Sequence, residues 1–271
     1  MARAATARAV HVPARAWWVL RQVGAVLLGV FVYFRVRGLT AARPGVAIDH
    51  AHQVLGFERR LGIDVERDVQ ASSTHHDWLT DLANWVYIWG HWPVIVTVMV
   101  WLALRHRTVF LRLRNAMFVS GGIGLVVFAT YPLAPPRLTA LGYVDTVTER
   151  SEAYRLLQPP AFVNPYAAMP SLHVGWDLLV GLAVASAAAS VLVRWMGRMM
   201  PVLMYAAVVL TANHYVVDGV AGAALALFGL AVAVWWERRD ARRQAETLQG
   251  LPRPRTAADA LEVSRPGSMA S

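Results

Sequence analysis

The sequence predicts an all-α membrane protein with six membrane-spanning helices, and three observations support this prediction. Apolar residues make up 56% of the 271 residues and charged residues only 16%, whereas soluble domains contain about 25% charged residues. Six apolar runs follow one another, and all but the short fifth, at 199–212, are close to the length that crosses about 30 Å of hydrocarbon. Arginine-rich loops without acidic residues alternate with loops of mixed charge, which is the charge pattern of a membrane topology.

The expected membrane-spanning segments cover residues 17–34, 83–104, 115–131, 171–193, 199–212 and 216–236. They divide the chain into a cytoplasmic N-terminal tail over 1–16, a membrane domain over 17–236 and a C-terminal part over 237–271. The Arg, Pro, Ala and Ser composition of the last part predicts a disordered cytoplasmic tail. Between the first two segments, residues 48–61 show the apolar spacing of an interfacial or re-entrant helix.

The arginines predict the orientation of the bundle. The loops expected after the second and fourth crossings contain no acidic residue and several arginines, namely Arg105, Arg107, Arg112, Arg114, Arg194 and Arg198. Loops of mixed charge, at about 35–81 and 132–170, alternate with them. Because arginine is enriched in cytoplasmic loops, we expect both termini inside and the mixed-charge loops outside.

The composition also excludes several kinds of chemistry. The chain has no cysteine, which excludes disulfides, thiolate catalysis and zinc sites with cysteine ligands. It has no lysine, which excludes Schiff-base chemistry. The formal charge of +9 could suggest nucleic acid. However, the arginines follow apolar segments rather than one polar face, so no nucleic-acid partner is expected.

Three short polar segments lie at the outer ends of expected crossings, and the topology places them on one face. They cover residues 131–138, 168–173 and 213–219. In the third, His214 and Asp218 are four residues apart, a spacing that puts two side chains on one helix face. The carboxylate could then fix the imidazole tautomer and leave the other ring nitrogen free to attack. A structural capping pair, or half of a metal site, is the alternative interpretation.

The other two segments offer groups that suit a phosphate. Ser171 is a candidate helix cap, and the free N–H groups behind it favour an anion. His173 follows within the first turn and could protonate a leaving alkoxide, or could simply be solvated. Arg137 follows two prolines and could bind a phosphoryl group bidentately, or could only anchor the chain at the lipid interface.

Several neighbouring residues are candidates for supporting roles. Asp177 lies one turn after His173 and could orient it, or could pair elsewhere in the bundle. Asn164 and Tyr166 lie in the loop before the second segment and could contact a headgroup or shape the turn. Asn213 directly precedes His214 and is a candidate phosphate ligand.

The three segments resemble motifs of the type 2 phosphatidic acid phosphatase superfamily, specifically its inositol phosphorylceramide synthase-like (inositolphosphotransferase) branch. The resemblance rests on Pro-Ser-Leu-His at 170–173, on His214 and Asp218 followed by Gly222, and on Pro-Pro-Arg at 135–137. It covers about residues 45–236, so the expected membrane domain would be the catalytic domain.

The resemblance implies a role for each residue. His214 would be the nucleophile that forms a phosphohistidine, Asp218 would orient it, and His173 would act as general acid and then as general base. Arg137, helped by Ser171 and Asn213, would bind the phosphate, and no metal or other cofactor is expected.

Two cations of the phosphatase form are missing from this sequence. Thr130 stands where that form has a lysine, and Ala207-Val208 stands where it has Ser-Arg. This departure favours the transferase-like branch, in which an alcohol replaces water as the acceptor.

We therefore expect a metal-independent lipid phosphotransferase or phosphatase, integral to a bacterial plasma membrane, with its active site on the outer face. Its partners would be a phospholipid substrate and, for transfer, a lipid alcohol acceptor. One alternative is a phosphatase for phosphatidic acid or polyprenyl diphosphate. Another is a transporter or structural bundle, in which His173, His214 and Asp218 need not approach one another.

Overall fold

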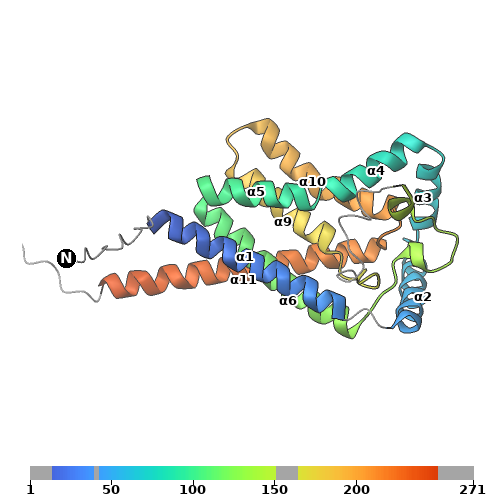
Figure 1. Cartoon of the computed structure of the whole chain (residues 1–271), viewed down its shortest axis with the longest axis horizontal. Coiled ribbons are helices and arrows are strands. Elements are labelled where there is room, and N and C mark those ends of the chain that lie inside the picture. The colour runs from blue at the N-terminus through green and yellow to red at the C-terminus, as the bar shows by residue number, and fades with distance from the viewer. Residues whose placement is uncertain (1–13, 40–42, 151–163, 250–271) are drawn as a thin grey trace, which may run out of the picture. The chain divides into compact units, whose positions relative to one another are not determined.

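The computed structural model describes residues 14–39, 43–150 and 164–249, and these residues form helices joined by short turns (Figure 1). Within this part of the chain the only β-type pairing is an isolated bridge between Leu133 and Ala167. The helices are α1 (Ala14–Leu39), α2 (Pro44–Leu61), α3 (Glu66–Thr74), α4 (Asp77–Trp89), α5 (Trp92–Arg105), α6 (Arg107–Thr130), the 3-10 turn η1 (Pro136–Leu138), α7 (Thr146–Arg150), α9 (Leu172–Ala187), α10 (Val191–Leu210) and α11 (Val216–Gln249). The all-α prediction is confirmed.

Four of these helices, α1, α6, α10 and α11, are long and apolar enough to cross a membrane, and α4 and α5 together make a fifth candidate bent by 42°. The bend falls at Gly90 and His91, between the two helices. Helix α9 is apolar but has only 16 residues, about 24 Å at the usual rise per residue. The described helices fit a membrane bundle, and six crossings remain a prediction.

Two of the expected loop boundaries are wrong. Helix α6 already begins at Arg107, so Arg112 and Arg114 belong to a helix and not to a loop. Helix α10 begins at Val191 and includes Arg194 and Arg198, so the fourth crossing ends earlier than expected. Arginine is a good helix former and extends its charged end toward water from a helix terminus, so a change in charge does not mark where a helix ends.

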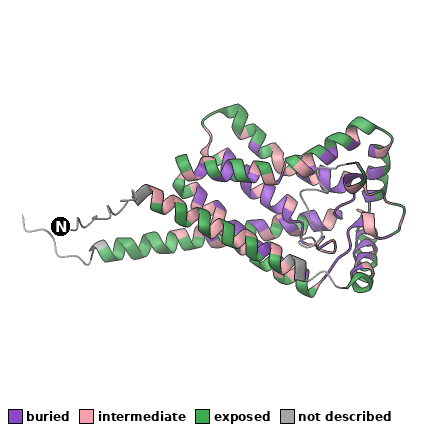
Figure 2. Ribbon diagram, in the orientation of Figure 1, coloured by how far each residue is buried: buried purple, intermediate pink, exposed green. Residues whose placement is uncertain are grey.

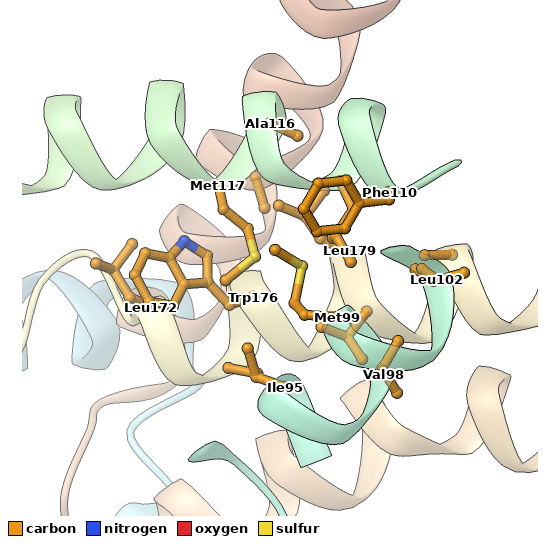
Figure 3. Close-up of a cluster of buried hydrophobic side chains, with 14 of the residues drawn as sticks. Ile95, Val98, Met99, Leu102, Phe110, Ala116, Met117, Leu172, Trp176 and Leu179 are labelled. Carbon is orange, nitrogen blue, oxygen red and sulfur yellow. The ribbon is translucent and has the colours of Figure 1, made fainter. Parts of the chain in front are cut away.

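Helix α9 is the most buried of the described helices. It contacts α10, α6 and α5, and Figure 2 shows buried residues along it, whereas α1 is largely exposed. Trp176 of α9 donates its indole N–H to Ser120 of α6 at 3.2 Å. Figure 3 shows the same indole beside Met117, in a cluster that extends to Phe110 and Leu179. The start of α9 is therefore held firmly between its neighbours.

Helices α2 and α3 lie next to the loops at the predicted outer end of the bundle. Helix α2 confirms the helix expected at 48–61, beginning earlier with Pro44 and ending at Gly62, whose φ of 68° suits glycine. Its buried face contains Ala47, Ala51, Val54 and Leu55, which pack against Leu133, Ala134, Ala168 and Tyr215. The α2 backbone also accepts the Ala134 N–H at Ala47, 3.0 Å away. These contacts position the loops that contain the predicted site.

The chain divides into two compact units, residues 1–233 and 234–271. The first contains every predicted site residue. Helix α11 continues to Gln249, beyond the expected end of the last crossing at 236. The rest of the expected C-terminal tail, from 250 onward, and most of the expected N-terminal tail lie outside the described residues.

Candidate active site

Backbone hydrogen bonds bring the three predicted segments together. Ser171 donates its N–H to the carbonyl of Asp218 at 3.0 Å, and Arg137 donates its N–H to the carbonyl of Ala212 at 3.0 Å. Ser171 also caps α9 as expected, since its hydroxyl accepts the Val174 N–H. The three predicted segments therefore lie side by side.

His214 and Asp218 form a buried pair. His214 Nδ1 lies 3.5 Å from Asp218 Oδ2, at the limit of a hydrogen bond, and Nδ1 has no other partner in the described part of the chain. His214 precedes α11 rather than lying on it, so the pair does not share a helix face. A turn provides the proximity instead: Asp218 reaches back from the first turn of α11 to accept the Tyr215 N–H at 3.0 Å. With Nδ1 facing the carboxylate, His214 Nε2 is the nitrogen left to react.

His173 lies next to His214. The centroids of the two rings are 5.7 Å apart. The imidazole of His173 stacks on Tyr87 at 4.6 Å and lies 4.4 Å from the ring of His91. The non-enzymatic alternative does not require this proximity, whereas a nucleophile and a general acid that act on the same phosphate do.

Arg137 is held at the same place by two polar side chains. Its Nε donates to Asn213 Oδ1 at 2.9 Å and its Nη1 donates to Asp145 Oδ2 at 2.5 Å. The Asn213 amide N–H groups are directed to Thr211. Asn213 therefore orients Arg137, and it also lines the small pocket. Its role as a phosphate ligand stays a prediction.

The candidates for supporting roles have different positions. Asn164 is buried and lines the pocket between His173 and His214. Tyr166 shapes the loop through its backbone, since its carbonyl accepts the Leu133 N–H at 2.8 Å. Asp177 pairs elsewhere in the bundle, which was the alternative to its orienting His173. Its Oδ1 accepts from His91 Nδ1 at 2.8 Å, and both side chains are buried.

The sequence interpretation missed His91. It lies inside an expected membrane crossing, and an ionisable group there is a usual sign of function, so the same rule that drew attention to His214 applies to it. Its partner, 86 residues later, could not be found from local spacing. The structure thus contains a second histidine–aspartate pair, in ring contact with His173.

We expect Asp177→Leu to destabilise the protein by about 3 kcal/mol, because it leaves a buried imidazole without its partner. The double variant His91→Phe, Asp177→Leu should recover most of this loss, since an apolar pair of similar volume needs no partner. Denaturant unfolding of the purified protein measures both. If the double variant were as unstable as the single one, the pair would contribute more to stability than the hydrogen bond between its two members.

Two cavities meet at His173. The first is small, about 40 Å³, and has polar groups from Arg137, Asn164, His173, Asn213 and His214 in its wall. The second has a volume of about 570 Å³ and is mostly aromatic, with Tyr33, Phe34, Trp92, Trp176 and His91 in its wall. Tyr33, Tyr87, Leu172 and His173 line both. One end of this combined site is suited to an anion and the other to a hydrocarbon.

Two buried glutamates also belong to the site and were not predicted. Glu58 of α2 accepts the Val217 N–H and Glu66 of α3 accepts the Val216 N–H, each at 2.8 Å. Both bind the first turn of α11, between His214 and Asp218. Among the described residues, no group of three or more His, Asp or Glu side chains is arranged to hold a metal ion.

The fold and site define a class: a membrane-type helical bundle in which two histidines and an arginine line a small pocket and an aspartate pairs with one of the histidines. The chain matches the family model of the PAP2 superfamily over residues 52–232 and belongs to that superfamily. Members of the superfamily are generally phosphatases or phosphotransferases. The apolar helices of this chain, together with its membership, identify it as an integral membrane protein. No curated protein and no solved structure matches it.

Proposed function

We propose that this protein transfers the phosphate-bearing group of a lipid phosphate ester through a phosphohistidine on His214. One observation supports this above all: His173 lies where the small polar pocket meets the large aromatic cavity. An amphiphile placed there would have its phosphate between the two histidines and its hydrocarbon chain among the tryptophans. Buried aromatic walls of this kind bind apolar groups through their large contact area.

In the first half-reaction, His214 Nε2 attacks phosphorus, the P–O bond to the lipid alcohol breaks, and His173 gives its proton to the departing alkoxide. In the second, an acceptor hydroxyl gives its proton to His173 and attacks phosphorus, and the P–N bond breaks. Asp218 stabilises the charge that His214 gains, and Arg137 stabilises the phosphoryl oxygens. The same first half-reaction serves transfer and hydrolysis.

The charge of the pocket favours a phosphodiester donor. Arg137 is already paired with Asp145, so the pocket offers little excess positive charge. At the two positions where the phosphatase form has cations, Thr130 is exposed with its hydroxyl bonded to its own helix, and Val208 is buried and apolar. A phosphomonoester carries nearly two negative charges at neutral pH, whereas a diester carries one. This supports the inositol phosphorylceramide synthase-like branch, with a phospholipid donor and a lipid alcohol acceptor.

The proposed orientation places both termini in the cytoplasm and the active site at the outer face of a bacterial plasma membrane. It follows from the arginines near the ends of α5, α6, α10 and α11, which would lie on the cytoplasmic side. The acceptor alcohol would then reach the pocket from the outer leaflet.

Purified protein in lipid vesicles tests the proposal. Phosphatidylinositol or phosphatidic acid is supplied with and without ceramide as the lipid alcohol, and free phosphate and new phospholipid are counted separately. We expect a new phosphodiester from phosphatidylinositol only when the acceptor is present. Rapid release of phosphate from phosphatidic acid without an acceptor would show that the protein is a phosphatase and that the low cation content does not select diesters.

A further inference from the structure

Three carboxylates cap three successive N–H groups at the start of α11. The oxygens are Asp218 Oδ2, Glu66 Oε1 and Glu58 Oε1, and they accept from Tyr215, Val216 and Val217 at 3.0, 2.8 and 2.8 Å. Such N–H groups have no partner within the helix, and a carboxylate there interacts well with the helix dipole. Only Asp218 belongs to α11; Glu58 and Glu66 come from α2 and α3, which contain none of the proposed reacting groups.

The second oxygen of each glutamate accepts no hydrogen bond from the described residues. Glu58 and Glu66 are both fully buried, and Glu58 Oε2 and Glu66 Oε2 have no hydrogen-bond partner among the described residues. The two side chains are within hydrogen-bonding reach of each other. Two ionised carboxylates in contact would repel and would each leave a desolvated oxygen. A single proton between the two oxygens removes both penalties, since one carboxyl then donates and the other accepts.

We propose that Glu58 and Glu66 share one proton and act as positioning residues that hold the turn carrying His214 and Asp218. The shared proton links α2 to α3, and the Oε1 atoms of the two glutamates accept the Val216 and Val217 N–H groups. These groups lie between the nucleophile and its orienting carboxylate. The distance between His214 and Asp218 therefore depends on two helices that place no residue in the wall of either cavity.

The surroundings of the pair leave few other groups that could replace the proton. The charged or titratable side chains around it are Asp218, His214 and Tyr215 at the start of α11, Tyr205 of α10, Tyr143 of the loop before α7, and Arg59 and Arg67 of α2 and α3. Tyr205 donates its hydroxyl to the Val216 carbonyl at 2.7 Å. Arg59 is directed to Asp64 at the exposed surface, and so it does not neutralise the pair.

Burial, reinforced by the carboxyl of Glu66 and opposed by the Val217 N–H, raises the pKa of Glu58 from 4.5 to about 8. Between these two values the folded protein keeps a proton that the unfolded chain has released. Stability therefore falls as pH rises from 4.5 to about 8 and levels off above that. In the folded protein, ionisation near pH 8 places a second negative charge beside Asp218 and weakens the hold on the turn.

The test compares Glu58→Gln and Glu66→Gln in the full-length protein. Glutamine keeps an oxygen for the backbone N–H and supplies an N–H in place of the shared proton. Wild-type turnover should drop about tenfold between pH 7 and pH 9, as expected for loss of one proton with a pKa near 8. Each glutamine variant should stay active at pH 7 and lose less activity than wild type over the same range, because any decline that deprotonation of His173 causes is common to all three proteins. Asp49→Asn on α2 and Asp68→Asn on α3 remove exposed carboxylates of the same helices and should keep the wild-type profile.

The melting temperature gives a second readout that does not depend on activity, whereas the turnover readout rests on the proposed function. Wild-type melting temperature should fall between pH 5 and pH 8, and both glutamine variants should show a flatter dependence. If both variants keep the wild-type decline in melting temperature, or unfold at pH 7, the shared proton is wrong. An inactive wild-type protein with the expected melting profiles would contradict the proposed function and leave the shared proton supported.

Discussion

His214→Ala is expected to lower the rate of phosphoryl transfer by about 10⁴-fold or more, because it removes the group that forms the covalent bond to phosphorus. The variant should still fold. His214 lies in a turn whose backbone N–H groups are bound by Asp218, Glu58 and Glu66, and these backbone hydrogen bonds do not involve the imidazole. Substrate should therefore still bind, and the loss should appear in kcat rather than in KM.

A donor lipid labelled at phosphorus distinguishes the roles of the two histidines. Wild-type protein mixed with donor and quenched early should carry label that acid removes, as a phosphohistidine would, and His214→Ala should carry none. His173→Ala should be slow with a natural lipid but recover about 10²-fold with a nitrophenyl ester, whose leaving group needs no proton. If the rate of His214→Ala recovered equally with the nitrophenyl ester, the roles of nucleophile and general acid would have to be exchanged between His214 and His173. His52→Ala, an exposed histidine on α2, is the matched control and should behave as wild type.

The sequence was sufficient to predict the residues that meet through local spacing and topology. His214 and Asp218 are four residues apart, and Ser171 is two residues from His173, so each pair is set by its own turn. The three segments were expected to meet because each lies at the same end of a predicted crossing, and backbone hydrogen bonds join them in the structure. The all-α class followed from the composition, the apolar runs and the distribution of arginines.

The partners that come from distant parts of the chain could not be predicted in this way. Glu58 accepts a hydrogen bond from Val217, 159 residues later, and Glu66 accepts one from Val216, 150 residues later. Nothing near the two glutamates in the sequence indicates a contact with α11. The expected loops failed for a different reason. Arg114 and Arg194 lie within α6 and α10, so a change in charge along the sequence does not mark the end of a helix.

Close contact between α9 and α11 gives the second large expected effect. A Cβ at Gly222 of α11 would lie 2.0 Å from the carbonyl oxygen of Ser171, and a Cβ at Gly175 of α9 would lie 2.5 Å from the carbonyl oxygen of Gly222. Both atoms are backbone and cannot move aside as a side chain would. The glycines therefore allow the helix starts that carry His173 and Asp218 to approach closely enough for the Ser171 N–H to bond to the Asp218 carbonyl.

Gly222→Ala should push these two helix starts apart. We expect a stability loss of about 3 kcal/mol, at the upper end of the usual range for overpacking. We also expect about a 100-fold loss of kcat/KM, since displacement of reacting groups by about 1 Å is enough for such a loss. Gly122→Ala is the matched control, because a Cβ there meets nothing within 4 Å, and it should leave activity unchanged and stability equal or about 0.5–1 kcal/mol higher.

Denaturant unfolding and the vesicle assay on the same preparations separate the two effects. If the contact only packs the bundle, Gly222→Ala should lose stability while the remaining folded protein keeps wild-type kcat/KM. If the contact sets the separation of His173 and His214, the folded protein should itself have a lower kcat/KM. A donor with a good leaving group should not restore kcat/KM, because the nucleophile is displaced as well as the general acid. A Gly222→Ala protein that is both stable and active would mean that α9 and α11 can move apart without disturbing the two histidines.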